Sequence, residues 1–104
     1  MIEILKISGD ELIAMIGQNK SLQFIDMSDQ ELGNGLPFET TAIAFPKIEA
    51  NINQINKHGL VVLACKHGEK SFFASHLLQT KYGFSNLRSL AAGIESLVKL
   101  INES

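Results

Sequence analysis

Short apolar runs alternate along this chain with longer segments whose apolar residues recur at helical spacing. The clearest run is Leu60–Ala64, whose β-branched side chains are typical of a strand buried on both faces of a sheet. Similar runs predict further strands at residues 2–7, 22–27, 42–45 and 86–90. The pattern therefore predicts strands and helices in alternation.

Helix signals fill the intervals between these runs. Ser8 and Glu11 have the spacing of a capping box, which predicts a helix after the first strand. Ser28 and Glu31 repeat this spacing, so a short helical turn is expected before the loop at residues 33–35.

Three later segments are also expected to be helical. Pro46 is expected to open the first of them, with Gly59 as its left-handed cap. Ser71 is placed to open the next helix, and Gly93 leads into the last. The residues expected to face the core are Ile48, Ile52 and Ile55 in the first helix, Phe73, Ala74, Leu77 and Leu78 in the second, and Ile94, Leu97, Val98 and Ile101 in the third.

This alternation predicts an α/β fold with a parallel sheet covered by helices on both faces. Functional groups in such sheets collect at the carboxyl ends of the strands. Asp26, Cys65 and the turn after Leu90 all follow predicted strands, so we expect them on one rim with the thiol in the middle.

Composition narrows the class of protein. A chain of 104 residues is expected to form one domain, and a net charge of -2 with no basic run argues against a nucleic-acid partner. A single cysteine excludes an internal disulfide and fits a reducing compartment. With no apolar segment of membrane-spanning length in the sequence, we expect a cytoplasmic protein without a membrane partner.

Cys65 lies where a strand meets a helix N-terminus. Nearby cations and the free N–H groups of a helix N-terminus both stabilise a thiolate, which is the reactive form of cysteine. Lys66 and Lys70 supply positive charge, and Gly68 lets the backbone curl so that N–H groups point inward. The alternative is a small buried hydrophobe, and the flanking sequence favours a functional thiol.

The stretch 60–71, LVVLACKHGEKS, resembles a motif of the rhodanese-like sulfurtransferase domains: a strand, then Cys, a basic residue, any residue, Gly, any residue, a basic residue and Ser. Asp26 resembles the aspartate that closes that family's second strand. Residues 42–46 resemble its strand-and-proline segment, and residues 82–87 followed by 90–94 resemble its final strand and glycine turn. The resemblance is to the small single-domain kind and covers essentially the whole chain.

The resemblance implies one rhodanese-like domain over residues 1–104, with a five-stranded parallel sheet flanked by helices on both faces. It also implies a thiosulfate-type sulfurtransferase without a cofactor. Cys65 takes a sulfane sulfur from thiosulfate, or from a protein or low-molecular-weight persulfide, and passes it to cyanide or a thiol. Because there is no second cysteine, the acceptor has to come from outside the chain, and a sulfur-relay protein is one candidate.

Within this mechanism Cys65 is the catalytic residue and Asp26 a supporting one. The residues expected to bind the small anionic donor, through N–H groups and lysine charge, are Lys66, His67, Gly68, Glu69, Lys70 and Ser71. The chain departs from the family at Ser28, where arginine is common. Both cationic loop positions are lysine, which cannot make the planar bidentate contact of arginine.

Several roles stay open from the sequence alone. His67 either positions a donor or faces solvent. Asp26 either orients the cysteine loop or, as we favour, is satisfied by backbone donors at a strand end. One of Phe72 and Phe73 is expected in the core and the other at the pocket border. No metal site is expected, because Cys65 and His67 have no matching second pair of ligands.

Two competing functions are also considered. Phosphatases and arsenate reductases of this fold carry an arginine six positions after the cysteine in a longer loop, where this chain has Ser71, so sulfur is favoured over phosphate. A weak or silent module that binds a partner protein is the other alternative. A silent copy would be expected to lose Cys65 or Gly68, and this chain keeps both.

Overall fold

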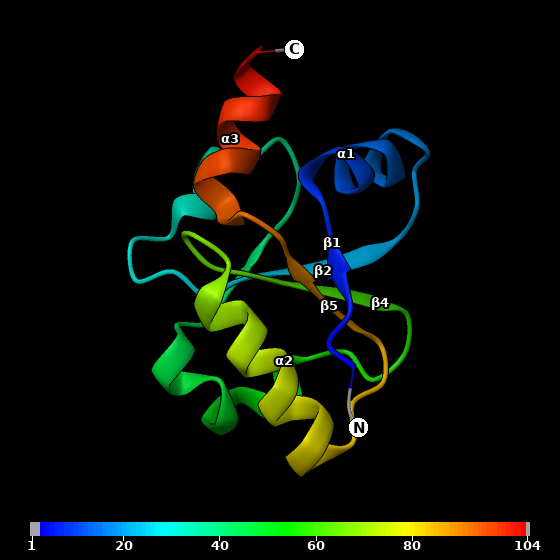
Figure 1. Ribbon diagram of the computed structural model, residues 1–104, viewed down its shortest axis with the longest axis vertical. Coiled ribbons are helices and arrows are strands. Elements are labelled where there is room, and N and C mark those ends of the chain that lie inside the picture. Colours follow the sequence, from blue (N-terminus) through cyan, green and yellow to red (C-terminus); the bar gives the residue numbers. More distant parts are fainter. Residues whose placement is uncertain (1–2, 104) are drawn as a thin grey trace.

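A five-stranded parallel sheet in the order β1-β5-β4-β2-β3 forms the centre of the molecule (Figure 1). The computed structural model describes residues 3–103. The strands are β1 Lys6–Ile7, β2 Leu22–Asp26, β3 Thr41–Ala42, β4 Leu60–Ala64 and β5 Leu87–Leu90. The expected α/β class, with five parallel strands, is confirmed.

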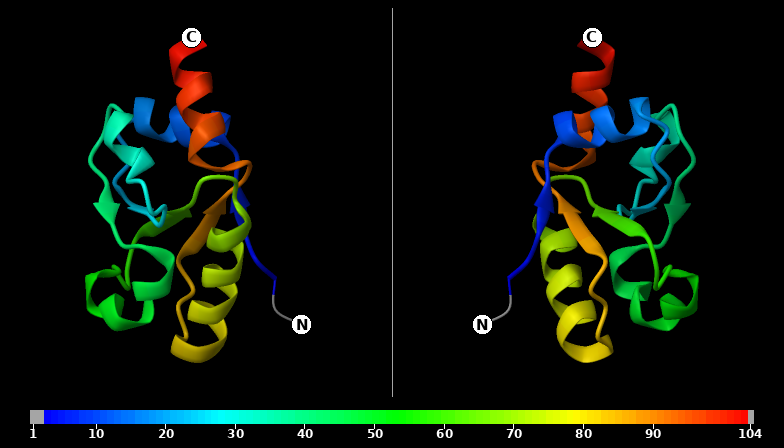
Figure 2. Two further views of the ribbon diagram at one scale, coloured as in Figure 1. Left: turned by 90° about the vertical axis from the view of Figure 1, so that its left-hand side faces the viewer. Right: turned by 90° about the vertical axis from the view of Figure 1, so that its right-hand side faces the viewer.

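Helices cover both faces of this sheet (Figure 2). Helices α1 (Gly9–Gly17) and α3 (Gly93–Glu103) lie on one face, and α2 (Glu69–Tyr82) lies on the other. Three short 3-10 helices complete the fold: η1 Leu32–Gly35, η2 Phe45–Lys47 and η3 Glu49–Gln54. No helix among residues 3–103 is long and apolar enough to span a membrane.

The central strand β4 supplies side chains to both cores, because alternate residues of a strand point to opposite faces. Val61 and Leu63 pack on the α2 side, whereas Val62 and Ala64 pack on the side of α1 and α3. All four are fully buried, which explains the continuous apolar run in the sequence.

Helix α2 presents small residues to the sheet. Ser71, Ala74, Ser75 and Leu78 are buried on its inner face. Phe73 is instead 66% exposed and Phe72 36% exposed, so the expectation that one of them lies in the core is wrong. The spacing of apolar residues predicted the wrong inner face, because two serines, Ser71 and Ser75, occupy it. Phe73 lies between them in the sequence and therefore points outward.

Two expected strands are shorter than the sequence suggested. β1 comprises only Lys6–Ile7, paired with Ser89 and Leu90 of β5, and Ile2 lies outside the described residues. β3 ends at Ala42, because the chain turns into η2 at Phe45.

The single helix expected from Pro46 is wrong. The segment forms η2 and η3, and Asn51 interrupts η3 with φ -118° and ψ 27°. Ile48 and Ile55 are nevertheless buried as expected. Gly59 has the expected positive φ of 80°, but η3 already ends at Gln54, so Gly59 shapes the turn into β4 rather than a helix end.

One local prediction remote from the rim is confirmed, because Ser8 and Glu11 form the expected capping box, with hydrogen bonds of 3.0 and 3.1 Å.

A further contact was not predicted from the sequence. Glu49 of η3 accepts hydrogen bonds from Lys81 Nζ at 2.8 Å and Tyr82 Oη at 2.7 Å, at the end of α2 remote from Cys65. These bonds lower the pKa of the Glu49 carboxyl and raise the pKa of the Lys81 ammonium.

Candidate active site

The expected rim exists. The loops after β2, β4 and β5 all leave the carboxyl ends of parallel strands, and β4 lies between β2 and β5 in the sheet. Cys65 follows β4 directly and its residue is only 3% exposed. The sheet order thus places the thiol between two neighbouring loops, as the sequence predicted.

Backbone N–H groups at the start of α2 surround the sulfur. Gly68 N–H donates to Cys65 Sγ with an N–S distance of 3.1 Å, and Ser71 N–H donates at 3.4 Å. Gly68 is the N-cap of α2, with φ 101°, so the helix begins at Glu69 and not at Ser71 as expected. A positive φ of this size suits glycine, which has no Cβ to clash with the backbone. The sulfur therefore occupies the anion-binding position of a helix N-terminus.

A pair of buried hydroxyls lies behind the sulfur. Ser71 Oγ is 3.7 Å from Cys65 Sγ, where it accepts from the thiol, and 3.1 Å from the carbonyl oxygen of Gly68. Ser89 Oγ of β5 is 2.8 Å from Ser71 Oγ. Ser89 is 2% exposed, and the sequence reasoning missed it. Ser89 could have been found from its position, because it lies on β5, the strand next to β4, where it pairs with Leu63 close to Cys65.

The turn between β5 and α3 packs directly against the backbone of the cysteine loop. Gly93 has φ 80°, and a Cβ on it would lie 2.1 Å from the carbonyl oxygen of Lys66. Ile94 N–H donates to the carbonyl oxygen of Cys65 at 2.8 Å. Only glycine permits this approach, so the loop and the start of α3 form one packed unit.

A separate segment, residues 28–32, faces the cysteine loop, and we call it the facing wall. Asp26 holds it in place: Oδ1 accepts from Ser28 N–H at 2.9 Å and from Ser28 Oγ at 2.6 Å, and Oδ2 accepts from Gly33 N–H at 2.8 Å. Asp26 is 1% exposed. The favoured interpretation of a carboxylate satisfied at a strand end is confirmed.

The helical turn expected from Ser28 and Glu31 is wrong. Ser28 Oγ donates to Asp26 and accepts from Leu32 N–H at 3.0 Å, while Glu31 adopts a left-handed φ of 48°. The 3-10 helix η1 therefore starts at Leu32 and occupies the segment expected to be a loop. Ser28 Oγ thus accepts from an N–H group one residue later than a capping box requires, while its own proton is held by the Asp26 carboxylate.

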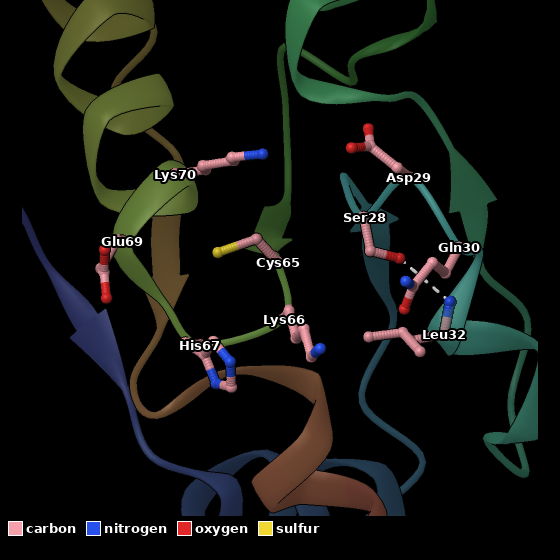
Figure 3. Close-up of a pocket in the computed structure, with 9 residues that line it drawn as sticks. All are labelled: Ser28, Asp29, Gln30, Leu32, Cys65, Lys66, His67, Glu69 and Lys70. Carbon is pink, nitrogen blue, oxygen red and sulfur yellow. Dashed lines mark hydrogen bonds between the residues drawn. The ribbon is translucent and has the colours of Figure 1, made fainter.

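The cysteine loop and the facing wall enclose a pocket of about 230 Å³ (Figure 3). The side of the cysteine loop contributes Cys65, Lys66, His67, Glu69 and Lys70, and the facing wall contributes Ser28, Asp29, Gln30 and Leu32. Of the residues expected at the site, Gly68 and Ser71 contact the sulfur, and Asp26 supports the wall without lining the pocket. Sequence reasoning missed Asp29, Gln30 and Leu32 as pocket residues.

Charges around this pocket are balanced rather than positive. Lys66 Nζ lies 3.5 Å from Glu95 Oε2 on α3. Lys70 makes no ion pair within residues 3–103, and its ammonium extends toward the exposed Asp29 across the opening (Figure 3). His67 is exposed on the loop. No cluster of three or more metal-binding side chains exists in the described part of the chain.

Comparison with known proteins finds no matching family model. The chain is 29% identical over 58 residues to the adenylyltransferase and sulfurtransferase UBA4 of Saccharomyces cerevisiae, a match that covers 56% of this chain. This match spans only 13% of the length of UBA4.

Solved structures match over nearly the whole chain. A rhodanese-like domain protein from Staphylococcus aureus has a TM-score of 0.79 at 23% identity, with 90% of this chain and 91% of that chain covered. An NAD-dependent persulfide reductase from A. fulgidus has a TM-score of 0.69 at 22% identity, with 88% of this chain and 15% of that chain covered. A yeast protein tyrosine phosphatase of the rhodanese family also has a TM-score of 0.69, at 9% identity, with 100% and 90% covered. The fold of this chain is therefore the rhodanese-like fold, as the resemblance in sequence implied.

Proposed function

We propose that this chain is a sulfurtransferase that carries a sulfane sulfur as a persulfide on Cys65. The observation that carries the proposal is the position of Cys65 Sγ, which accepts N–H groups of Gly68 and Ser71 at the base of a pocket. A thiolate, and the terminal sulfur of a persulfide, are both stabilised by such donors.

The reaction has two steps. The Cys65 thiolate attacks the sulfane sulfur of a donor and forms Cys65–S–S⁻; with thiosulfate the S–S bond of the donor breaks and sulfite leaves with the bonding electron pair. A thiophilic acceptor, cyanide or a thiol, then attacks the outer sulfur and regenerates the Cys65 thiolate. The sulfurtransferase name of UBA4 supports this class of reaction.

The acceptor is proposed to be external, because the chain has one cysteine and cannot release the persulfide as an internal disulfide. A sulfur-relay protein or a small thiol fits this requirement. Because the Cys65 thiol has to stay reduced to accept each new sulfur, we propose that the reaction takes place in a reducing compartment, the cytoplasm. A phosphatase is disfavoured, because Ser71 and not an arginine lies six positions after Cys65.

Intact-mass measurement tests the proposal. The protein is incubated with thiosulfate or with a persulfide donor, and cyanide is added afterwards. We expect the mass to increase by one sulfur atom and to return on cyanide treatment, with thiocyanate formed. Cys65→Ser should show neither change. If no donor adds sulfur to the wild type, the chain is a binding module and the proposal is wrong.

A further inference from the structure

The facing wall of the pocket lacks the positive charge that a dianionic donor requires. Ser28 occupies the position where the sequence resemblance would place an arginine, and its hydroxyl proton is already donated to Asp26 at 2.6 Å. The next residue, Asp29, is exposed and lines the pocket. It has no hydrogen bond or ion pair within residues 3–103. The wall therefore presents an unpaired carboxylate to a ligand.

The cysteine loop offers one free cation. Lys66 points away from the sulfur toward α3, where Glu95 lies 3.5 Å from its ammonium (Figure 3). Lys70 is exposed and extends over the opening toward Asp29. The nearest carboxylate on the loop, Glu69, lies on the outer side of the loop in the same view. Of the charged side chains that line the pocket, Lys70 and Asp29 are thus the two that face each other across the opening, and neither makes an ion pair among residues 3–103.

We infer that the donor is the persulfide of a small zwitterionic amino thiol, such as cysteine persulfide, rather than thiosulfate. This inference rests on the proposed function and specifies its substrate. The donor carboxylate pairs with Lys70 and the donor ammonium pairs with Asp29, while the sulfane sulfur reaches Cys65. A pocket of about 230 Å³ accommodates a molecule of that size. Thiosulfate, with two negative charges, gains from Lys70 but is repelled by Asp29.

The transfer step balances without an oxidant. The Cys65 thiolate attacks the outer sulfur of the protonated donor R–S–SH, the S–S bond of the donor breaks, and the thiolate R–S⁻ leaves with the electron pair. The product is Cys65–S–SH, so the sulfane sulfur keeps its proton and its oxidation state. The N–H groups of Gly68 and Ser71 donate to Cys65 Sγ, the attacking atom, and so stabilise its thiolate.

The test measures second-order rate constants for sulfur loading of Cys65 by mass spectrometry, with cysteine persulfide, thiosulfate and the persulfide of 3-mercaptopropionate, which lacks the ammonium. Asp29→Asn is expected to lower the rate with cysteine persulfide and to raise the rate with thiosulfate, each by about three- to fivefold, the effect of one partly exposed charge contact. Asp29→Arg should raise the thiosulfate rate further. Lys70→Gln should slow all three donors.

Glu31→Gln is the matched control. It removes the same charge from the same exposed segment, but Glu31 does not line this pocket. Equal effects of Glu31→Gln and Asp29→Asn would overturn the inference, since only the overall charge would then matter. A wild type that loads from the ammonium-free persulfide as fast as from cysteine persulfide would overturn it too, while leaving the sulfurtransferase proposal intact. Failure of every donor to load Cys65 would refute both.

Discussion

The two sides of the pocket are built by different means. On the cysteine loop, the groups that contact the sulfur are mostly backbone N–H groups, and the loop is fixed by the close approach of Gly93 and the hydrogen bond from Ile94. On the facing wall, exposed side chains line the pocket and one buried carboxylate, Asp26, holds the segment. A side-chain substitution in the cysteine loop leaves the backbone N–H donors in place, whereas a substitution in the wall changes the groups that line the pocket. We therefore expect substitutions in the facing wall to change donor selectivity without changing the reactivity of Cys65.

The largest effect is expected at the base of the cysteine loop. Gly93→Ala would put a Cβ 2.1 Å from the carbonyl oxygen of Lys66, in a backbone conformation with φ 80°. Overpacking together with left-handed strain should destabilise the protein by on the order of 3 kcal/mol. Urea unfolding measures the change. Gly83→Ala, with φ 74° and nothing within 4 Å, is the control and should cost only about 1 kcal/mol. Equal losses would show that the loop is not locked by this contact.

The facing wall should respond next. Asp26→Asn keeps one carbonyl oxygen and turns an NH₂ group toward one of the N–H groups now bound, that of Ser28 or Gly33. Losing a hydrogen bond to a buried carboxylate should cost about 2 kcal/mol. Sulfur loading should slow while alkylation of Cys65 by iodoacetamide stays unchanged.

Asp29→Asn is the control for the stability measurement alone, because it makes the same chemical change at an exposed position of the wall. Its free energy of unfolding should match the wild type. A parallel loss of alkylation rate in Asp26→Asn would mean that Asp26 acts on the cysteine loop as well, and the two sides would no longer be independent.

A smaller effect is expected from the hydroxyl pair. Ser71 Oγ lies 3.7 Å from Cys65 Sγ and donates to the Gly68 carbonyl oxygen. Its bond to Ser89 Oγ at 2.8 Å therefore fixes the hydroxyl beside the sulfur. Ser89→Ala should cost about 1 kcal/mol and slow iodoacetamide alkylation at pH 7 by a few-fold. Ser75→Ala removes an equally buried hydroxyl, which bonds only the Ser71 carbonyl oxygen. It should lower stability without slowing alkylation; equal alkylation rates in the two variants would refute the role of Ser89.

The smallest effect is expected at Glu49, which contacts the C-terminal end of α2. This site lies far from the pocket and so serves as a reference for both the cysteine loop and the facing wall. Hydrogen bonds from Lys81 and Tyr82 lower the pKa of Glu49 below its ordinary value of 4.5. Glu49 therefore stabilises the fold above its unfolded-state pKa, and this contribution is lost as the pH falls through its folded-state pKa. Glu49→Gln should lower the melting temperature slightly at pH 7 and not at all in strong acid, with sulfur loading unchanged.

The control for this reference is Glu39→Gln, because Glu39 is exposed and has no hydrogen bond or ion pair among residues 3–103. It should show no such pH dependence. A change in sulfur loading in Glu49→Gln would mean that α2 transmits strain to Cys65.

Much of the cysteine side could be predicted from sequence, because it is local. An apolar strand, Cys65, Gly68 and a helix follow one another directly, and the rule for parallel sheets placed them on the rim. The facing wall could not be predicted in the same way. Its conformation depends on Asp26 binding Gly33 N–H, seven residues away, and this contact overrides the capping spacing of Ser28 and Glu31.

Two other errors have a similar origin. Apolarity predicts Phe73 in the core, but the inner face of α2 consists mostly of small side chains, two of them serines. Ser89 was missed because its role arises from a neighbour in space, Ser71, eighteen residues earlier in the chain. A contact between a helix and a strand is not visible in the local periodicity of either segment.

The hydrogen bond from Ile94 N–H to the Cys65 carbonyl oxygen makes one amide a spectroscopic reporter of the cysteine loop. Solvent deuterium can replace this proton only when the contact between the loop and α3 opens, so its exchange rate measures how often the site loses its shape. The signal requires neither a substrate nor a label on the thiol. Loading of Cys65 and opening of its support can thus be followed in the same sample.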